Sequence, residues 1–536
     1  MRLKVNVFTR QIATFSSPPQ ASVALETRPH ARWPHPSPVF PGRATAAQSA
    51  CGGPPPSAKP GGGGRSSCRP PETTGTAFVS ESAQPAEPRP SDAIYYAIAL
   101  AAGAVVGLIG SYFHLGTVAI ASWITHLKPV FSGGSLILAS SVTAAIMVVA
   151  AVWLVRTFCP EAAGSGVQEI EGAMEGLRTV RWKRILPVKF VGGLLALGSG
   201  LVAGREGPTI HMGASVAQAA SDWFRLPVRD TRGLLAAGGA AGLAAAFNAP
   251  LAAILFVIEE TRRQFPYGFR TYTAVILGSF ASAVVCELIT GTSPALEMFA
   301  PKLPLVWLPA FFGLGIVLGV VGVLFNKALI ASLDTSLKIG RRWSPYLVPL
   351  VVGAAIGALL ILRPEATGGG EVLVIALAQK NLPLAALAIV VVIRFVMTMF
   401  SYSTGVPGGI FAPILALATS IGLLYATVLQ LALPLPEGAQ AAFAIAAMGG
   451  LFSSTVRAPL VGMVLVAELT GAYTLLVPVI LTCVTANIVA EALGGRPIYE
   501  VLLERTLRLA GLTPPPADAE DAVGGWDARE RIASKD

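Results

Sequence analysis

From residue 93 to residue 490 the sequence is a succession of long apolar stretches. Several of them exceed the roughly 20 residues that a helix needs to cross the hydrocarbon core of a bilayer. Backbone polar groups inside a bilayer must be hydrogen-bonded within the protein, and long continuous apolar runs achieve this as helices. With 53% hydrophobic and only 13% charged residues, the chain is predicted to be an all-α polytopic membrane protein. The stretches lie at roughly 93–124, 133–157, 185–202, 233–258, 271–290, 304–332, 344–362, 382–400, 409–433 and 438–490.

The two ends of the chain differ from this apolar middle. Residues 1–90 hold 16 of the 41 prolines and the run Gly61–Gly64, and they show no apolar period. Such a segment cannot bury enough surface to order itself, so we predict a disordered Pro/Gly-rich extension, with a basic, transit-like leader as the alternative. Residues 509–536 are polar and are predicted to form a disordered cytosolic tail. Because no large regulatory domain follows the apolar region, we expect a prokaryotic protein of the bacterial inner membrane.

Composition and motifs argue against several other classes of protein. The net charge of +9 comes mainly from the N-terminal segment and from short polar breaks, without the basic stripe and interleaved aromatics of a nucleic-acid-binding surface. His114, His126 and His211 are interpreted as ordinary polar positions near helix ends. No CxxC, HExxH or GxSxG motif occurs, so we expect no metal site, no cofactor and no catalytic residue. The scattered cysteines, which indicate no disulfide framework, are Cys51, Cys68, Cys159, Cys286 and Cys483.

The apolar region contains an internal repeat. Three segments recur in the same order about 200 residues later, with spacings that differ by only a few residues, which is typical of transporters whose substrate site lies between two halves. We therefore predict two homologous transmembrane halves, 91–300 and 301–508. Spacing alone leaves open whether the second half is inverted. The matching segments are PEAAGSG at 160–166 with PEATGGG at 364–370, GREGP at 204–208 with GIFAP at 409–413, and APL at 249–251 with APL at 458–460.

Three of the glycine-containing breaks are candidates for an anion site. They are GSG at 164–166, GREGP at 204–208 and GIFAP at 409–413, and each precedes a stretch that can form a helix. The first N–H groups of a helix lack partners inside the helix and carry partial positive charge, so converging N-termini bind an anion without a buried cation. For any one motif the commoner explanation is that Gly and Pro allow helices to pack closely.

Taken together, these motifs resemble those of the chloride channel/transporter (CLC) family, whose members carry GSGIP, GREGP and GxFxP in this order. With FNAPL at 247–251 and RPIY at 496–499, the resemblance extends from about residue 92 to 508. It implies a fold of two inverted halves with many tilted and broken helices. It also implies a homodimer in which each subunit has its own anion path, and a secondary active transporter that exchanges chloride for protons.

The resemblance also assigns residues to the anion site. It implies that Ser165 contributes a hydroxyl to the central anion and that Tyr499 contributes a phenol from the opposite side. Backbone N–H groups would come from Ile410 and Phe411. Family members that prefer nitrate carry proline in place of this serine, so Ser165 favours chloride. The sequence departs from the family at Gln168, where GSGIP has proline, which puts the local turn and fine selectivity in question.

Two acids are assigned to proton transfer. An ionised Glu206 at a helix N-terminus can occupy an anion position, and protonation would release it, so that one side chain both competes with the anion and carries the proton. A static helix cap is the alternative role. The resemblance makes Glu260 the internal proton glutamate, although a Glu pair at a helix end is usually only solvated. Supporting roles are expected for Gly166, Lys189, Arg205 and Gly207.

Three rival functions remain open at this stage. A passive chloride channel of the same fold would move chloride without protons. A fluoride/proton antiporter is disfavoured because such members resemble GREGT rather than GREGP and lack the serine. A membrane enzyme or scaffold would not depend on Ser165 and Tyr499 for anion flux.

Overall fold

The computed structural model describes residues 90–261, 268–292, 296, 298, 300–301, 303–370, 374 and 383–512. The predicted N-terminal extension, apart from Pro90, lies outside these residues. So does the predicted tail from residue 513 onward.

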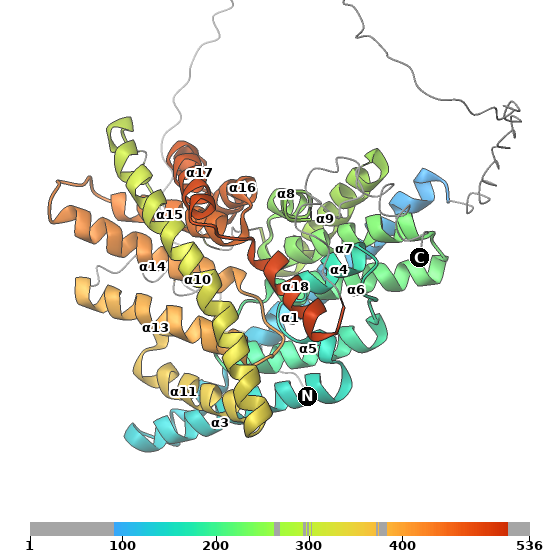
Figure 1. Cartoon of the computed structure of the whole chain (residues 1–536), viewed down its shortest axis with the longest axis horizontal. Helices are drawn as coiled ribbons and strands as arrows, with labels where there is room; N and C mark the ends of the chain where they lie inside the picture. The colour runs from blue at the N-terminus through green and yellow to red at the C-terminus, as the bar shows by residue number, and fades with distance from the viewer. Residues whose placement is uncertain are drawn as a thin grey trace, which may run out of the picture. The chain divides into compact units, whose positions relative to one another are not determined.

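The described chain is built from helices, and the only β pairing in it is two isolated bridges, Gly164 with Pro407 and Gly204 with Gly409. Eight of its helices are long and apolar enough to cross a bilayer, which confirms the predicted polytopic helical fold. The helices (Figure 1) are α1 Asp92–Ala121, α2 Trp123–Leu127, α3 Gly133–Phe158, α4 Val167–Met174, α5 Trp182–Gly198, α6 Glu206–Phe224, α7 Val228–Phe247, α8 Pro250–Glu260, α9 Phe269–Thr290, α10 Leu308–Arg342, α11 Leu347–Leu362, α13 Leu384–Ser403, α14 Phe411–Gln430, α15 Ala439–Val456, α16 Pro459–Thr470, α17 Leu476–Ala492 and α18 Ile498–Leu509.

Two of the predicted apolar stretches are broken into shorter helices. The stretch 233–258 divides into α7 and α8 at Asn248, whose φ is +53°, and a proline follows at the start of α8. The stretch 438–490 divides into α15, α16 and α17, with φ of +70° at both Arg457 and Gly471. A left-handed residue ends one helix, and a proline in the first turn begins the next. Because these few residues barely interrupt the apolar run, the hydropathy pattern alone does not reveal the break.

The packing of helices in the first part of the chain is repeated in the second. Helix α1 packs against α7 and α9, α7 packs against α9, and α6 packs against α7. In the same pattern α10 packs against α15 and α17, α15 packs against α17, and α14 packs against α15 (Figure 1). This arrangement matches the internal repeat of the sequence, while the boundary at residue 300 stays a prediction.

Reciprocal hydrogen bonds show that the two halves are inverted. The Glu259 carboxylate at the end of α8 accepts the N–H groups of Leu460 and Val461 at the start of α16, at 3.2 and 2.7 Å. In return, the Glu468 carboxylate near the end of α16 accepts those of Leu251 and Ala252 at the start of α8, at 3.1 and 2.8 Å. Each helix therefore begins where the other ends. Such an exchange of equivalent contacts is the mark of an approximate two-fold relation.

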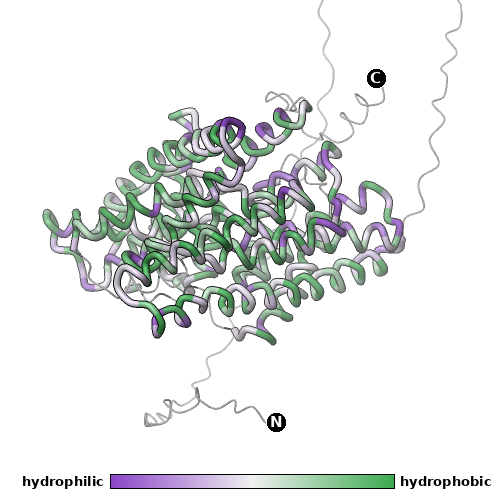
Figure 2. Tube along the Cα trace, turned by 90° about the horizontal axis from the view of Figure 1, so that it is seen from below, coloured by the Kyte–Doolittle hydropathy of each residue, from purple (hydrophilic) through white to green (hydrophobic). Residues whose placement is uncertain are grey.

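The surface of the described helices suits a lipid environment. Hydrophobic residues run along most of the helices in Figure 2. Large apolar side chains such as Leu138, Ile146 and Leu288 are 67%, 63% and 81% exposed. Apolar exposure on this scale over many spanning helices is expected where acyl chains, rather than water, surround the protein.

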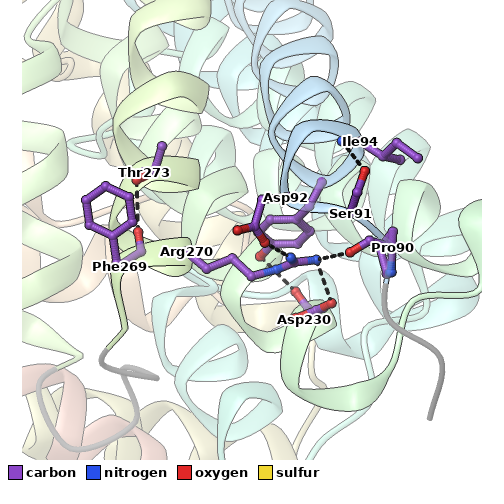
Figure 3. A network of polar contacts seen from close by, with 9 residues as sticks. Pro90, Ser91, Asp92, Ile94, Asp230, Phe269, Arg270 and Thr273 are labelled. Atoms are coloured by element: carbon purple, nitrogen blue, oxygen red, sulfur yellow. Dashed lines mark hydrogen bonds and ion pairs between the residues drawn. The ribbon is translucent and has the colours of Figure 1, made fainter.

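A polar cluster joins the starts of α1, α7 and α9 (Figure 3). Arg270, at the start of α9, pairs with Asp92 of α1, and it contacts Asp230 of α7 at 3.1 Å. Its guanidinium also donates to the Pro90 carbonyl at 3.0 Å and lies 4.4 Å from the centre of the Tyr95 ring. One planar, multivalent side chain thus fixes the ends of three helices.

Candidate anion site

The three glycine motifs come together through backbone pairing. Gly204 and Gly409 exchange N–H···O=C bonds of 2.8 and 2.7 Å. The Gly164 N–H donates to the Val406 carbonyl at 3.0 Å, and the Gly408 N–H donates to the Gly164 carbonyl at 3.1 Å. The loops that precede α4, α6 and α14 are therefore joined to one another, as the anion-site prediction requires.

Ser165 lies in a loop whose shape depends on glycine. Its neighbours Gly164 and Gly166 have φ of +61° and +91°, a conformation that disfavours other residues. A Cβ at position 207 would lie 2.5 Å from Ser165 Oγ, so only glycine lets α6 approach this closely. Ser165 is fully buried, and its hydroxyl has no hydrogen-bond partner among the described residues. It is therefore available to a bound ion.

The opposite wall of the site is aromatic. Tyr499, in the first turn of α18, is fully buried, and its ring centre lies 6.3 Å from that of Phe411 and 6.4 Å from that of Phe256. Its hydroxyl lies near the Ser165 hydroxyl, but the two do not form a regular hydrogen bond. Like Ser165, it finds no hydrogen-bond partner in the part of the chain that the structure describes.

Helix α14 starts at this place. Ile410 is its N-cap and Phe411 its first residue, and both are fully buried. The first N–H groups of a helix have no acceptor inside it, so these residues can supply backbone donors.

Glu206 is the first residue of α6 and is fully buried. Its Oε2 lies 2.0 Å from where a Cβ on Gly204 would be and 3.3 Å from the equivalent point on Gly409. The carboxylate is therefore folded against the paired loops. A Cβ at Gly409 would also lie 2.8 Å from the backbone nitrogen of Gly207, so this position requires glycine. Arg205, the N-cap of α6, contacts the His114 ring of α1.

The two glutamates at the end of α8 have different surroundings. Glu259 caps α16 through its carboxylate, as described above. Glu260 lies within electrostatic range of Tyr499, as does Glu206. Tyr499 therefore interacts electrostatically with both of the acids assigned to proton transfer.

Lys189 supports the loop that carries Ser165. Its ammonium group is fully buried and donates to the carbonyls of Ala162 and Gly164 at 3.1 and 2.7 Å. The Lys189 ammonium group therefore stabilises the conformation of the loop by binding its carbonyl oxygens.

Gln168 does not prevent α4 from forming. The helix begins at Val167 with Gly166 as its N-cap, and Gln168 is its second residue. The side chain is 7% exposed, with Oε1 lacking a partner within the described ranges. The turn therefore exists without proline, and the effect of Gln168 on selectivity stays a prediction.

Two further residues lie beside the site, and the sequence analysis assigned neither of them to it. The Tyr402 hydroxyl accepts the Ser165 N–H at 3.4 Å, across 237 residues of chain. His211 is fully buried in the second turn of α6, with Nδ1 2.3 Å from where a Cβ on Gly166 would be. The sequence analysis interpreted it as an ordinary polar position near a helix end, and the structure adds that it is buried beside the Ser165 loop. The only signal for Tyr402 was its place shortly before GIFAP, and for His211 its place shortly after GREGP.

Comparisons with known proteins agree with this geometry. The family model described as "Voltage gated chloride channel" matches residues 145–491. A protein of Vibrio parahaemolyticus named H(+)/Cl(-) exchange transporter ClcA is 44% identical over 414 residues, which cover 76% of this chain and 88% of that protein. A protein of the same name from Salmonella arizonae is 39% identical over 426 residues, covering 76% of this chain and 88% of the relative.

Solved structures show the same fold. A structure described as a slow cyanobacterial Cl-/H+ antiporter is similar with a TM-score of 0.74 and 36% identity, covering 77% of this chain and 98% of that one. A CLC-type fluoride/proton antiporter is similar in fold with a TM-score of 0.62 at 20% identity, covering 76% and 97% of the two chains. With its broken helices, its inverted halves and these relatives, this chain belongs to the CLC family of voltage-gated chloride channels and related transporters.

Proposed function

We propose that this protein exchanges chloride for protons across a membrane. The observation that carries the proposal is the place of Glu206: a buried carboxylate at the start of α6, folded against the paired loops at Gly204 and Gly409. An acid in this position competes with an anion for the same partial positive charge. The names of the relatives, exchange transporters and an antiporter, support the same function.

Chloride would be held weakly by neutral donors. The Ser165 and Tyr499 hydroxyls supply two of them, and the N–H groups of Ile410 and Phe411 supply the others. A site of this kind replaces enough of the hydration shell to admit the ion, yet lets it leave, which conduction requires.

Glu206 would couple the proton to the anion. When ionised, its carboxylate occupies the anion position at the α6 N-terminus and blocks the path. When protonated it loses the charge that holds it there, and the side chain moves away so that chloride takes its place. The proton then passes to the inner solution by way of Glu260, which, like Glu206, interacts electrostatically with Tyr499. One proton-carrying side chain and one anion thus alternate at a single position.

The active form would be a homodimer in the bacterial inner membrane, with one anion path in each subunit. Eight candidate spans and the bacterial exchange transporters among the relatives support the membrane location. The dimer rests on the resemblance to the family.

Chloride efflux tests the anion part of the proposal. Proteoliposomes loaded with KCl and diluted into chloride-free buffer with valinomycin should release chloride, and release should fall strongly in a variant that combines Ser165→Ala and Tyr499→Ala. Ser135→Ala, on the exposed start of α3, is the matched control and should release chloride like the wild type. Wild-type protein that releases no chloride, or a double variant that releases it at the wild-type rate, would contradict this site.

A further inference from the structure

The second half contains a loop with the same backbone shape as the Ser165 loop. Residues 160–166 and 364–370 both begin with a short 3₁₀ turn, at Pro160–Ala162 and at Pro364–Ala366. The φ angles of the glycines then agree, +61° at Gly164 with +67° at Gly368, and +91° at Gly166 with +101° at Gly370. The same loop shape, called a cradle below, therefore occurs once in each half, at residues 160–166 and at 364–370.

Each cradle has its own buried cation. Lys189 supports the first loop, and Arg394, which stands 205 residues later in α13, supports the second. Arg394 is fully buried, and it donates from Nε to the Glu365 carbonyl at 3.2 Å and from Nη2 to the Thr367 carbonyl at 2.8 Å. The two side chains therefore do the same work of holding loop carbonyls.

The loops 160–166 and 364–370 differ in which hydrogen-bond donor has no acceptor. In the first cradle the unused donor is the Ser165 hydroxyl, whereas the second cradle has Gly369 at the equivalent position and no hydroxyl. In its place, Nη1 of Arg394 has no acceptor among the residues that the structure describes. Nη1 lies 3.1 Å from where a Cβ on Gly370 would be, so it points at the glycine end of the loop.

A buried guanidinium with an unused N–H is costly within a membrane protein. An unpaired buried cation is destabilising, and this destabilisation is relieved when an anion supplies both the missing charge and the missing acceptor. The Glu365 carboxylate lies 3.6 Å from Arg363, and Glu365 gives Arg394 only its main-chain carbonyl.

We propose that Arg394 and the loop 368–370 hold a second small anion, a halide, in the second half of the protein. Because a full cation binds this ion, it leaves slowly and is a resident ion, in contrast to the chloride in transit at Ser165. The proposal does not depend on transport at Ser165.

Anomalous diffraction from bromide-soaked crystals of the full chain tests the proposal. We expect one bromide peak at hydrogen-bond distance from Arg394 Nη1, separate from the peak at Ser165. After transfer into halide-free buffer, the peak at Arg394 should outlast the peak at Ser165. Water density alone at Nη1, at a bromide concentration that fills the Ser165 site, would overturn the proposal. Loss of both peaks at the same rate would show that the halide at Arg394 is not a slowly released, resident ion.

Variants separate this site from the transport site. In Ser165→Ala with Tyr499→Ala the bromide peak at Arg394 should persist, and its loss there would count against a separate site. Arg394→Met should abolish the peak. Arg394→Lys keeps the charge and should retain a weaker peak, and this variant replaces the methionine variant if the latter does not fold. Bromide at Ser165 alone refutes this proposal and leaves the transport site unaffected. Bromide at Arg394 alone supports this proposal and refutes the anion site at Ser165.

Discussion

Around Ser165 the site depends on contacts between single atoms. Gly207 lies so close to Ser165 that a methyl group at this position would stand 2.5 Å from the hydroxyl oxygen and 2.7 Å from the Cα atom. The cradle and the start of α6 can approach each other only because this residue has no side chain.

Gly207→Ala should therefore disrupt the anion site. We expect a cost of about 1–3 kcal/mol from overpacking, and a large loss of chloride efflux from proteoliposomes, because Ser165 must shift. Gly134→Ala is the control, since a Cβ at this position meets nothing within 4 Å. Efflux from the Gly207 variant equal to that of the control would show that the close contact is unimportant.

The Tyr402 hydroxyl is expected to position Ser165. Tyr402→Phe removes the acceptor of the Ser165 N–H, so calorimetric titration in detergent should show weaker chloride binding, by about 1 kcal/mol. Tyr425→Phe loses a hydrogen bond to the Ala310 carbonyl of 2.9 Å that lies in another part of the fold, and it should bind chloride like the wild type. Equal chloride affinity in both variants would refute the positioning role.

At the scale of elements, the halves are tied together where α8 and α16 cap each other. A carboxylate at a helix N-terminus accepts unpaired N–H groups and interacts favourably with the helix dipole. Because each helix supplies the cap of the other, the two contacts belong to one interface.

Charge removal at these caps should weaken that interface. Glu259→Gln and Glu468→Gln should each lower the free energy of unfolding by about 1 kcal/mol, and their effects should not add, because both caps serve the same pair of helices. Thermal unfolding in detergent measures this, with the exposed Glu287→Gln as control. Strict additivity would mean that the two caps act independently.

The Arg270 cluster gives a second prediction at this scale. Arg270→Lys keeps the charge but cannot reach Asp92, Asp230 and the Pro90 carbonyl together, so the midpoint of thermal unfolding should fall, with a cost of about 1–2 kcal/mol. Arg184→Lys, at an exposed position of α5, should leave it unchanged. An unchanged midpoint in the Arg270 variant would show that the cluster adds no stability.

The sequence predicted the parts of this structure that depend on interactions between residues close together in the chain. The apolar stretches predicted the spanning helices, and the glycine motifs predicted where loops need a left-handed φ or close contact. The breaks at Asn248 and Arg457 were missed, because a single left-handed residue barely changes an apolar pattern.

Contacts between distant segments were also beyond the sequence. Tyr402 and His211 are buried residues of spanning or partly buried helices. In the sequence, an aromatic or polar residue there looks the same whether it faces a neighbouring helix or the anion site. The roles of Ser165, Glu206 and Tyr499 came from the resemblance to a family, and here the structure adds their convergence at one place.

At the scale of the whole molecule, the two inverted halves bring backbone donors to the anion site from both halves. The loops of both halves meet at Gly204 and Gly409, and the starts of α6 and α14 bring their unpaired N–H groups to the same region. The fold thus makes an anion site from backbone, and Glu206 adds an acid to it. Coupling of chloride to protons is the central consequence.

Uphill proton movement tests this coupling most directly. Proteoliposomes with high internal chloride and equal pH on both sides are diluted into low chloride with valinomycin, and the external pH is recorded with and without a proton ionophore. Protons should enter as chloride leaves, so the external pH should rise until the ionophore is added, and the rise should vanish in Glu206→Gln and in Glu260→Gln. Chloride release without any change of external pH in the wild type would contradict the exchange mechanism and identify a passive channel.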